Sequence, residues 1–355
     1  MRGGGVRHFV GGSSAAILVA LGVASTVQGT VAAQGGVQDT RAQAAHCTPA
    51  GAGQDSFCIV SGLKLNYIDW GGAGPAVVLL AGLGSSAHTF DDFAPLLRQG
   101  HRVLAFTRRG YGASGTPTDG DYSNRALVSD ALGLMDALDI TRASFVGHSI
   151  AGGELATLGA AHPDRVDRLV YIDAAYDRTR VAQLMAGVPT LPPPSAGVRR
   201  DLDSLTRWRE AALGVHLPSV RHDLAQIMVH TRDGWVPRTS EAISAVVLAG
   251  DIAAVARWEK IAAPSLALFT SKDVTDQVPP DASPAQRAAF LDYSIRVIRP
   301  WMLRAQADFI EHSHCGVAVE VPHSTHHLFL ERPQWTAQVI LEFLAAADPC
   351  HLRVQ

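Results

Sequence analysis

The sequence predicts an α/β fold, with a doubly wound, mostly parallel sheet and a helical lid inserted after the sixth strand. Short apolar runs alternate with segments of helical periodicity from residue 57 onward, and this alternation is typical of a parallel sheet. The alternation stops over residues 177–262, which are mostly helical in pattern. An insertion of this kind is expected to cover the carboxyl edge of the sheet, where open α/β sheets bind ligands.

Six strands are predicted before the insertion. Two β-like runs between Phe57 and Trp70 are separated by Ser61-Gly62, which indicates a hairpin. Residues 76–80 form a continuous apolar run, as expected for a parallel strand buried on both faces. The other predicted strands cover residues 102–106, 143–146 and 169–172. Helical spacing predicts the intervening helices, which cover residues 90–97, 126–138 and 151–161.

The alternation resumes after the insertion. A strand is predicted over residues 265–269, a long helix over 284–311, a last strand over 317–321 and a closing helix over 335–344. The chain is therefore divided into four parts. They are a signal peptide (1–33), a lead-in (34–56), a core (57–176 and 263–355) and the helical lid (177–262).

Composition excludes two classes of protein. The chain has 355 residues, of which 47% are hydrophobic and 18% charged. It is too apolar for a disordered protein and long enough for one large domain. The formal net charge of −3 excludes a strongly basic nucleic-acid binder.

The N-terminus has the layout of a secretory signal peptide. Arg2 and Arg7 precede a short apolar segment at residues 15–24. Residues 31–33 are small and offer a cleavage position after Ala33. We therefore expect a secreted or periplasmic protein with no stable membrane insertion after cleavage. A short membrane anchor is the alternative interpretation.

The four cysteines agree with export, because disulfides persist in oxidising compartments. The sequential pairing, Cys47 with Cys58 and Cys315 with Cys350, is the most economical of three possibilities. Buried free thiols are the alternative. A zinc site at these cysteines is disfavoured because the sequence has no Cys-x-x-Cys pair.

The candidate nucleophile is Ser149. It lies in a Gly-x-Ser-x-Ala motif between the predicted strand 143–146 and the predicted helix 151–161. A nucleophile in this position needs a sharp turn that raises its side chain above the sheet, and small flanking residues allow the backbone to pass closely. The alternative role for Ser149 is that of a helix N-cap.

A serine hydroxyl needs a base, and the candidate is His326, with His327 as its rival. Residues 325–333 read Thr-His-His-Leu-Phe-Leu-Glu-Arg-Pro. This segment and the serine motif resemble those of capped α/β-hydrolases, in which the catalytic histidine follows the last strand in a small-His-x-x-x-x-Glu-x-Pro stretch. The resemblance covers most of residues 57–347 and places His326 at the catalytic position. Thr325 stands where the family more often has glycine.

The resemblance also implies an acid that orients the histidine. Asp273 follows the strand 265–269 and matches the family's turn, with Thr270 at a position where the family has glycine. Asp276 is a near alternative. Asp173 is a third, because some relatives carry the acid one strand earlier. An ionised carboxylate in this place fixes the tautomer of the histidine and stabilises the imidazolium.

Two backbone N–H groups are expected to form an oxyanion hole. Ile150 follows the nucleophile and supplies one, and Leu83 matches the family position that supplies the other. The family usually has His-Gly where this chain has Ala81-Gly82. Residues 109–114 resemble the family's Arg-Gly-x-Gly-x-Ser loop, which we expect to be structural.

The sequence as a whole predicts a secreted serine hydrolase that acts on a small, uncharged carboxylic ester, with lactones next. Amides, thioesters, carbon–carbon bonds and cofactor-free perhydrolysis stay open as reactions of the same fold. A catalytically silent binding protein is the alternative from another class. A serine at position 149 argues against the Asp-dependent haloalkane and epoxide hydrolases of the family. No cofactor is expected, and a metal at the histidines near residues 312–327 is disfavoured by their spacing.

Overall fold

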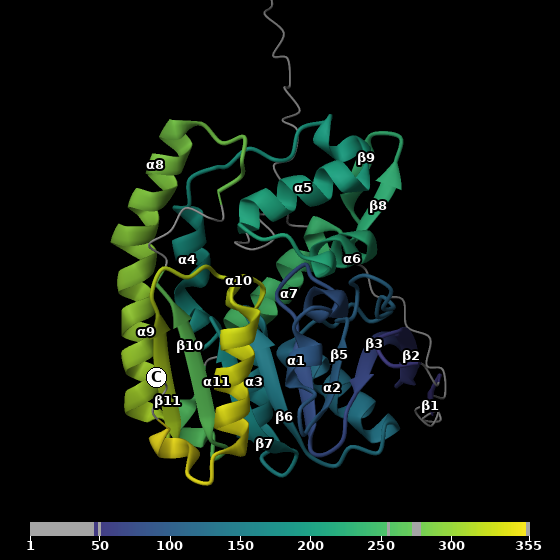
Figure 1. Ribbon diagram of the computed structural model, residues 1–355, viewed down its shortest axis with the longest axis vertical. Helices are drawn as coiled ribbons and strands as arrows, with labels where there is room; N and C mark the ends of the chain where they lie inside the picture. The colour runs from purple at the N-terminus through teal and green to yellow at the C-terminus, as the bar shows by residue number, and fades with distance from the viewer. Residues whose placement is uncertain (1–45, 49–50, 254–255, 272–277, 353–355) are drawn as a thin grey trace, which may run out of the picture.

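The computed structural model describes residues 46–48, 51–253, 256–271 and 278–352 (Figure 1). Its central element is a nine-stranded sheet in the order β1-β2-β3-β5-β4-β6-β7-β10-β11. The pairs among β4, β5, β6, β7, β10 and β11 are parallel, whereas β1, β2 and β3 pair antiparallel at one edge. This arrangement confirms the predicted doubly wound, mostly parallel sheet.

The strands of this sheet have the following bounds: β1 His46–Cys47, β2 Asp55–Val60, β3 Leu63–Gly71, β4 Ala76–Leu80, β5 Arg102–Phe106, β6 Ala143–His148, β7 Val166–Ile172, β10 Ser265–Thr270 and β11 Gly316–Val321. A separate hairpin consists of β8 Met228–Thr231 and β9 Gly234–Pro237. The α-helices are α1 Ala94–Leu97, α2 Asn124–Ala137, α3 Ala151–Ala161, α4 Val181–Ala186, α5 Leu202–Leu213, α6 Pro218–Ile227, α7 Glu241–Ala253, α8 Pro284–Tyr293, α9 Arg299–His312, α10 Leu328–Glu331 and α11 Pro333–Ala345.

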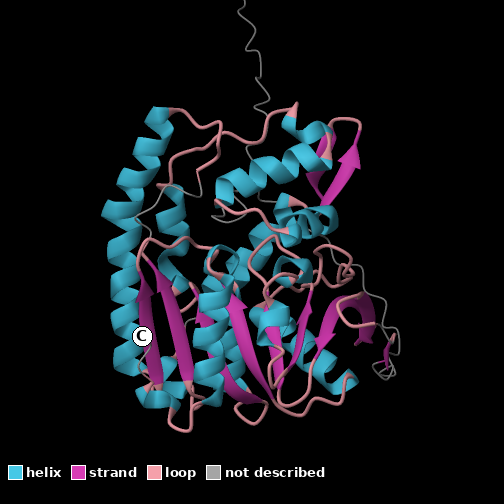
Figure 2. Cartoon of the chain, viewed as in Figure 1, coloured by secondary structure: helices cyan, strands magenta, loops and turns pink. Residues whose placement is uncertain are grey.

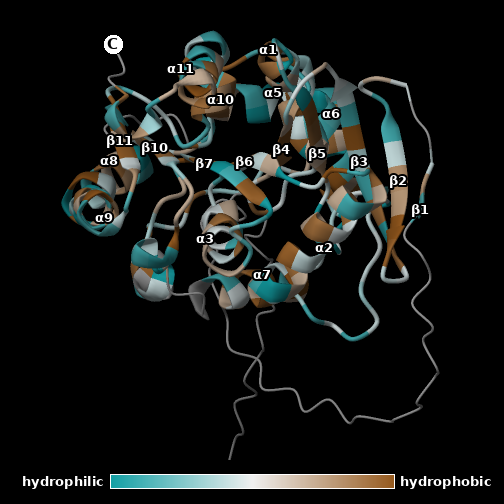
Figure 3. Ribbon diagram, turned by 90° about the horizontal axis from the view of Figure 1, so that it is seen from below, coloured by the Kyte–Doolittle hydropathy of each residue, from teal (hydrophilic) through white to brown (hydrophobic). Residues whose placement is uncertain are grey.

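Helices cover both faces of the sheet (Figures 2 and 3). In the view of Figure 3, α1 and α11 lie on one face, and α2 and α3 lie on the other. The strand β4 shows how the two apolar cores form. Val78 and Leu80 pack with the α2 and α3 side, whereas Val77 and Leu79 pack with the α1 and α11 side. All five residues of β4 are buried, as expected for a central parallel strand.

The helical insertion lies between β7 and β10 in sequence, and Figure 1 shows it above the carboxyl ends of the central strands. It contains α4, α5, α6 and α7. It also contains the β8–β9 hairpin, which the sequence analysis did not predict. The turn of this hairpin ends at Gly234, whose φ of +97° favours glycine. Asp233-Gly234 is a hairpin signal, but the two strands are only four residues long.

The long helix predicted over 284–311 is divided. A π-helical segment, Ser294–Ile298, separates α8 from α9. Pro300 lies in the first turn of α9 and has no amide hydrogen to donate to the preceding turn. The break therefore has a local cause in the sequence.

Both predicted disulfides are present. Cys47 on β1 pairs with Cys58 on β2, its direct neighbour in the antiparallel register. Cys315 pairs with Cys350 and so ties the start of β11 to the C-terminal turn. All four cysteines lie in the described residues, and none is free.

Thiol titration of the denatured, non-reduced protein is therefore expected to detect no free thiol. Reduction before the titration should release all four. Each bridge constrains the unfolded chain, so its reduction should lower the free energy of unfolding by roughly 2–4 kcal/mol. Detection of four thiols without a reductant would contradict the disulfide assignment.

The predicted signal peptide and most of the lead-in lie outside the described residues. Among the helices that are described, none combines the length and the apolar character needed to cross a membrane.

Candidate active site

Ser149 lies at the carboxyl end of β6, in the turn that leads into α3. Its φ of +58° is rare for a residue other than glycine and marks the sharp strand-to-helix turn expected for a nucleophile. Two contacts hold this turn. The Ser149 amide donates to the Ile172 carbonyl at 3.2 Å, and the Ser149 carbonyl accepts a hydrogen bond from the Arg178 guanidinium.

Glycines allow the chain to pass close to this turn. A Cβ atom on Gly152 would lie 1.9 Å from the carbonyl oxygen of Ala174. A Cβ atom on Gly147 would lie 2.8 Å from Leu155 Cδ1. The first clash is with backbone and cannot be relieved by a rotamer change. The requirement for small residues around Ser149 is thus a packing requirement.

His326 is the histidine that contacts the candidate nucleophile. It lies in the loop after β11, and its Nε2 atom is 2.7 Å from Ser149 Oγ. Its Nδ1 atom forms a hydrogen bond with Asp173 Oδ2. The arrangement fits an imidazole that donates from Nδ1 to the carboxylate and accepts the serine proton at Nε2. The rival, His327, is buried beside it and lines the same cavity.

The carboxylate at His326 is Asp173, the alternative placed one strand earlier. It lies directly after β7, is fully buried and has a φ of +46°. Parallel strands end at the same edge of the sheet, so the turns after β6 and β7 bring Ser149 and Asp173 to one place. Asp273, our first choice for the acid, and Asp276 lie outside the described residues.

Two further groups hold the Asp173 carboxylate. The Tyr176 hydroxyl donates a hydrogen bond to Asp173 Oδ1, and the Thr270 amide lies 3.4 Å from the same oxygen. Burial and the neighbouring carboxylate raise the pKa of Tyr176 well above its usual value, so the phenol stays a donor. Tyr176 was not predicted from the sequence, although a tyrosine three residues after Asp173 is close enough in the chain to donate to its carboxylate.

His148 contacts the loop that carries His326. It is buried, and its Nε2 atom lies 2.7 Å from the backbone carbonyl of His326. The two rings lie 4.5 Å apart between centroids. A Cβ atom on Gly82 would lie 2.7 Å from His148 Nδ1. His148, the residue directly before Ser149 in the motif, therefore packs against the loop after β4. The sequence analysis assigned no role to His148.

Arg108 connects the loop after β4 to helix α3. Its Nη2 atom donates to the Ala81 carbonyl at 2.8 Å, and its Nη1 atom donates to the Gly82 carbonyl at 3.3 Å. Its Nε atom donates to Glu154 Oε1 at 3.0 Å. Both partners of this ion pair are buried. The arginine of the neighbouring loop 109–114, Arg109, forms a buried ion pair with Asp130 at 2.6 Å, which agrees with the structural role expected for that loop.

Replacement of Glu154 with glutamine is expected to destabilise the protein. The change leaves the buried Arg108 guanidinium without a counter-charge, which costs about 3–5 kcal/mol of unfolding free energy. Equilibrium denaturation with urea would measure this. The exposed pair Arg142–Asp167 is the matched control, because Asp167→Asn should change stability by less than about 1 kcal/mol. Equal effects of the two variants would contradict the role given to the buried pair.

Above Ser149 lies a cavity of about 110 Å³. It is lined by His326, the loop after β4 and the insertion. The residues that form it include Gly82, Leu83, Tyr111, Ser149, Leu205, Trp208, Arg209, Val220, Asp223, Leu224, His326 and Leu330. Its wall is mostly apolar, and two charged groups, Arg209 and Asp223, interrupt it. Burial raises the pKa of Asp223 to about 6, although its carboxylate accepts two hydrogen bonds from Ser86.

The four tryptophans in or beside the lid have different surroundings. Trp208 lines the cavity. Trp258 and Trp301 pack in the core on the α3 side, and Trp235 packs against the other core. Of the histidines near the C-terminus, His312 and His314 are exposed and contact Asp308 and the Glu259 carbonyl, so they do not form one cluster with His326.

Comparison with known proteins supports this architecture at the level of the family. The model of the alpha/beta hydrolase family matches residues 77–339. The chain is 33% identical over 148 residues to a 2-hydroxymuconate semialdehyde hydrolase of Pseudomonas sp. (strain CF600), which is 41% of this chain and 52% of that relative. It is 38% identical over 107 residues to a fluoroacetate dehalogenase of Burkholderia sp., which is 29% of this chain and 35% of that relative. The chain thus spans about half, or less, of these relatives' lengths.

Solved structures agree on the fold. An E-2-(acetamidomethylene)succinate hydrolase superposes with a TM-score of 0.59 at 21% identity, over 82% of this chain and 99% of that chain. The enol-lactonase of Burkholderia xenovorans LB400 superposes with a TM-score of 0.53 at 22% identity, over 82% of this chain and 100% of that chain. With the family match over residues 77–339, these findings establish that the chain belongs to the alpha/beta hydrolase family.

Proposed function

We propose that this protein is a serine hydrolase that cleaves carboxylic esters, and lactones next, through Ser149, His326 and Asp173. One observation carries the proposal. The Ser149 hydroxyl lies 2.7 Å from His326 Nε2, while the other ring nitrogen bonds to a buried carboxylate. A serine activated in this way is suited to attack an acyl carbonyl. The role of Asp173 replaces that expected for Asp273.

The proposed reaction has two halves. Ser149 Oγ attacks the ester carbonyl while His326 Nε2 takes its proton, and the same proton then goes to the leaving alkoxide. This leaves an acyl-enzyme and releases the alcohol. Water, deprotonated by His326, attacks the acyl carbon and releases the carboxylic acid, and the proton returns to Ser149. Asp173 holds the ring and stabilises the imidazolium in both halves.

The N–H groups of Leu83 and Ile150 are proposed to bind the oxyanion. In a trans peptide unit, the carbonyl and the following N–H point in opposite directions. Arg108 holds the Gly82 carbonyl, so the Leu83 N–H points away from Arg108, and Leu83 lines the cavity. Ile150 is buried at the start of α3, where free N–H groups favour negative charge.

The cavity favours a small acyl substrate. Its volume of about 110 Å³ is below the roughly 150 Å³ of an engineered cavity that accepts benzene. The apolar wall suits the uncharged ester that we expected. Arg209 and Asp223 add polar contacts that an entirely apolar substrate would leave unused, so esters with a polar or acidic substituent belong among the substrates to be tested.

A panel of substrates distinguishes ester hydrolysis from the other reactions of the fold. A panel of p-nitrophenyl esters, lactones, thioesters and amides is expected to show ester hydrolysis as the fastest reaction, with lactones next.

Two disulfides support a secreted or periplasmic location, since such bridges persist in oxidising compartments.

A fluorophosphonate probe tests the nucleophile directly. The probe should label the parent protein with a stoichiometry of one, and peptide mapping should place the label on Ser149. Acid denaturation before labelling should abolish the reaction, because it depends on the folded triad. Absence of labelling together with no turnover of any acyl substrate would favour the silent binding protein and overturn the proposal.

A further inference from the structure

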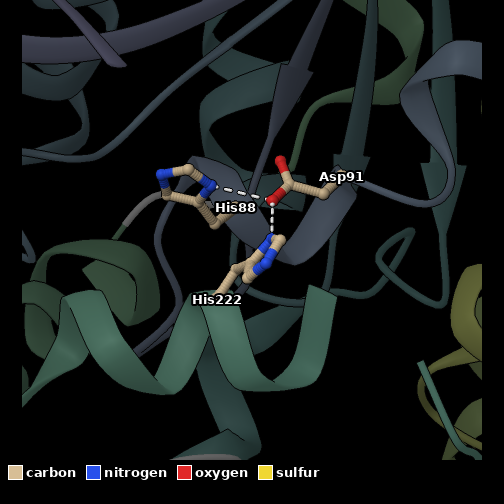
Figure 4. Close-up of side chains that lie close together, drawn as sticks. All are labelled: His88, Asp91 and His222. Carbon is tan, nitrogen blue, oxygen red and sulfur yellow. Dashed lines mark hydrogen bonds and ion pairs between the residues drawn. The ribbon is translucent and has the colours of Figure 1, made fainter. Parts of the chain in front are cut away.

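Three metal-ligating side chains lie together outside the active site. They are His88, Asp91 and His222 (Figure 4). His88 lies on the short 3-10 helix Ala87–Phe90 that follows β4, and Asp91 is the residue that caps the end of this helix. His222 lies on α6. His88 Nδ1 lies 2.8 Å from Asp91 Oδ2, and His222 Nδ1 lies 2.7 Å from the same oxygen. One ligand atom of each residue lies within 4.8 Å of the others. The cluster joins the core to the insertion.

We propose that His88, Asp91 and His222 bind a divalent transition-metal ion of the zinc type. Two imidazole nitrogens and one carboxylate oxygen are a ligand set that zinc accepts, with water as a fourth ligand. With metal–ligand bonds of 2.0–2.1 Å, ligand atoms in a tetrahedral site lie about 3.3 Å apart. Each nitrogen–oxygen distance therefore needs to open by about half an ångström. The exposed His222 side chain can supply this for its own distance to Asp91.

The surroundings of His88 match those of a metal ligand. Its other ring nitrogen, Nε2, lies 3.2 Å from Asp55 Oδ1. A metal-bound histidine usually donates its second N–H to a carboxylate, which fixes the tautomer and orients the ring. Asp55 is itself held, because Asn66 Nδ2 donates to Oδ1 at 2.6 Å and Gln226 Nε2 donates to Oδ2 at 3.3 Å. His88 bound to a metal would thus be satisfied at both nitrogens.

Asp91 adds an independent observation. In the described part of the chain, its Oδ1 atom is buried and has no hydrogen-bond partner. Both histidines instead point at Oδ2. A buried carboxylate oxygen with no donor is costly. A cation between the two rings would neutralise the negative charge of the Asp91 carboxylate. The Oδ1 atom would then need no hydrogen-bond donor of its own.

The site has a structural consequence, because α6 forms one wall of the cavity through Val220, Asp223 and Leu224. The helix already contacts the core where the Ser86 amide donates to Asp223 Oδ1 at 2.7 Å. A metal ion at His222 would add a further link, one residue before Asp223 in the chain. Metal binding should therefore stabilise the folded protein.

Isothermal titration of tag-free, EDTA-treated protein with zinc chloride tests the proposal. We expect one zinc ion per chain, a rise of several degrees in the melting temperature and reversal by EDTA. His222→Ala and Asp91→Asn should lose this binding. Asp55→Asn should keep the site but weaken it by about 10–100-fold, the usual effect of removing a carboxylate behind a histidine ligand. Magnesium chloride should not compete, since Mg²⁺ prefers oxygen ligands.

His312 provides the matched control. It forms a pair with Asp308 on α9, with 3.1 Å between Nδ1 and Oδ1, but it is not part of the three-residue group. His312→Ala should leave zinc binding unchanged. The proposal is overturned if the parent binds no zinc, or if His222→Ala binds it as tightly as the parent, which would mean that the cluster is only a hydrogen-bonded contact. The titration should also be repeated with Ser149→Ala. Zinc binding by this variant would show that the metal site does not depend on the proposed hydrolase activity.

Discussion

Ser149→Ala is expected to lower the turnover of an activated ester by about 10⁶-fold while the protein stays folded. The serine supplies the atom that forms the acyl-enzyme, so no covalent route remains without it. Removal of a nucleophile that works as part of a triad costs about as much as removal of the whole triad, and the remaining rate comes from binding and the oxyanion hole. Steady-state kinetics on p-nitrophenyl acetate would measure the loss.

The control for this variant is its fold. The positive φ of Ser149 is set by the turn, so alanine carries the same backbone strain. Circular dichroism and the melting temperature should therefore stay close to those of the parent. Activity within tenfold of the parent would remove Ser149 from the proposed role and direct attention to another nucleophile.

Asp173→Asn is expected to lower turnover by about 10⁴-fold, with little change in substrate binding. The substitution keeps the shape but removes the charge that stabilises the imidazolium. It also offers an amide that favours the wrong tautomer of His326. Because Tyr176 donates to Asp173 Oδ1 and His326 bonds to Oδ2, the amide group of asparagine cannot satisfy both partners as an acceptor.

Asp273→Asn and Asp276→Asn are the comparison variants. If Asp173 orients His326, both should retain activity within about tenfold of the parent, since only one carboxylate can occupy the Nδ1 side of the ring. All three proteins should be compared on one ester, with circular dichroism to exclude misfolding. If Asp273→Asn loses most of its turnover while Asp173→Asn keeps nearly all of it, the acid is Asp273, as first expected from the sequence.

Most of the fold could be predicted because its signals are local. The apolar run 76–80 and the helix 151–161 coincide with β4 and α3. A central parallel strand needs continuous apolar residues, and a helix on its face needs a regular apolar stripe, so each element is encoded where it forms. The β8–β9 hairpin is the counterexample, since four-residue strands carry too few residues to show a period.

The sequence favoured the disulfide pairing that the structure contains, and it predicted the family and the two residues now found at hydrogen-bond distance, Ser149 and His326. Each lies in a contiguous motif whose spacing reflects its own turn. Which carboxylate meets His326 became clear only from the three-dimensional arrangement of the strands. The parallel strands β7 and β10 end at the same edge of the sheet, and a candidate aspartate follows each of them in the sequence. The left-handed backbone of Asp173 after β7 and the hydrogen bond from the Tyr176 hydroxyl direct its carboxylate toward the His326 ring. The direction of a side chain in a turn depends on contacts of this kind, which a local sequence pattern does not specify.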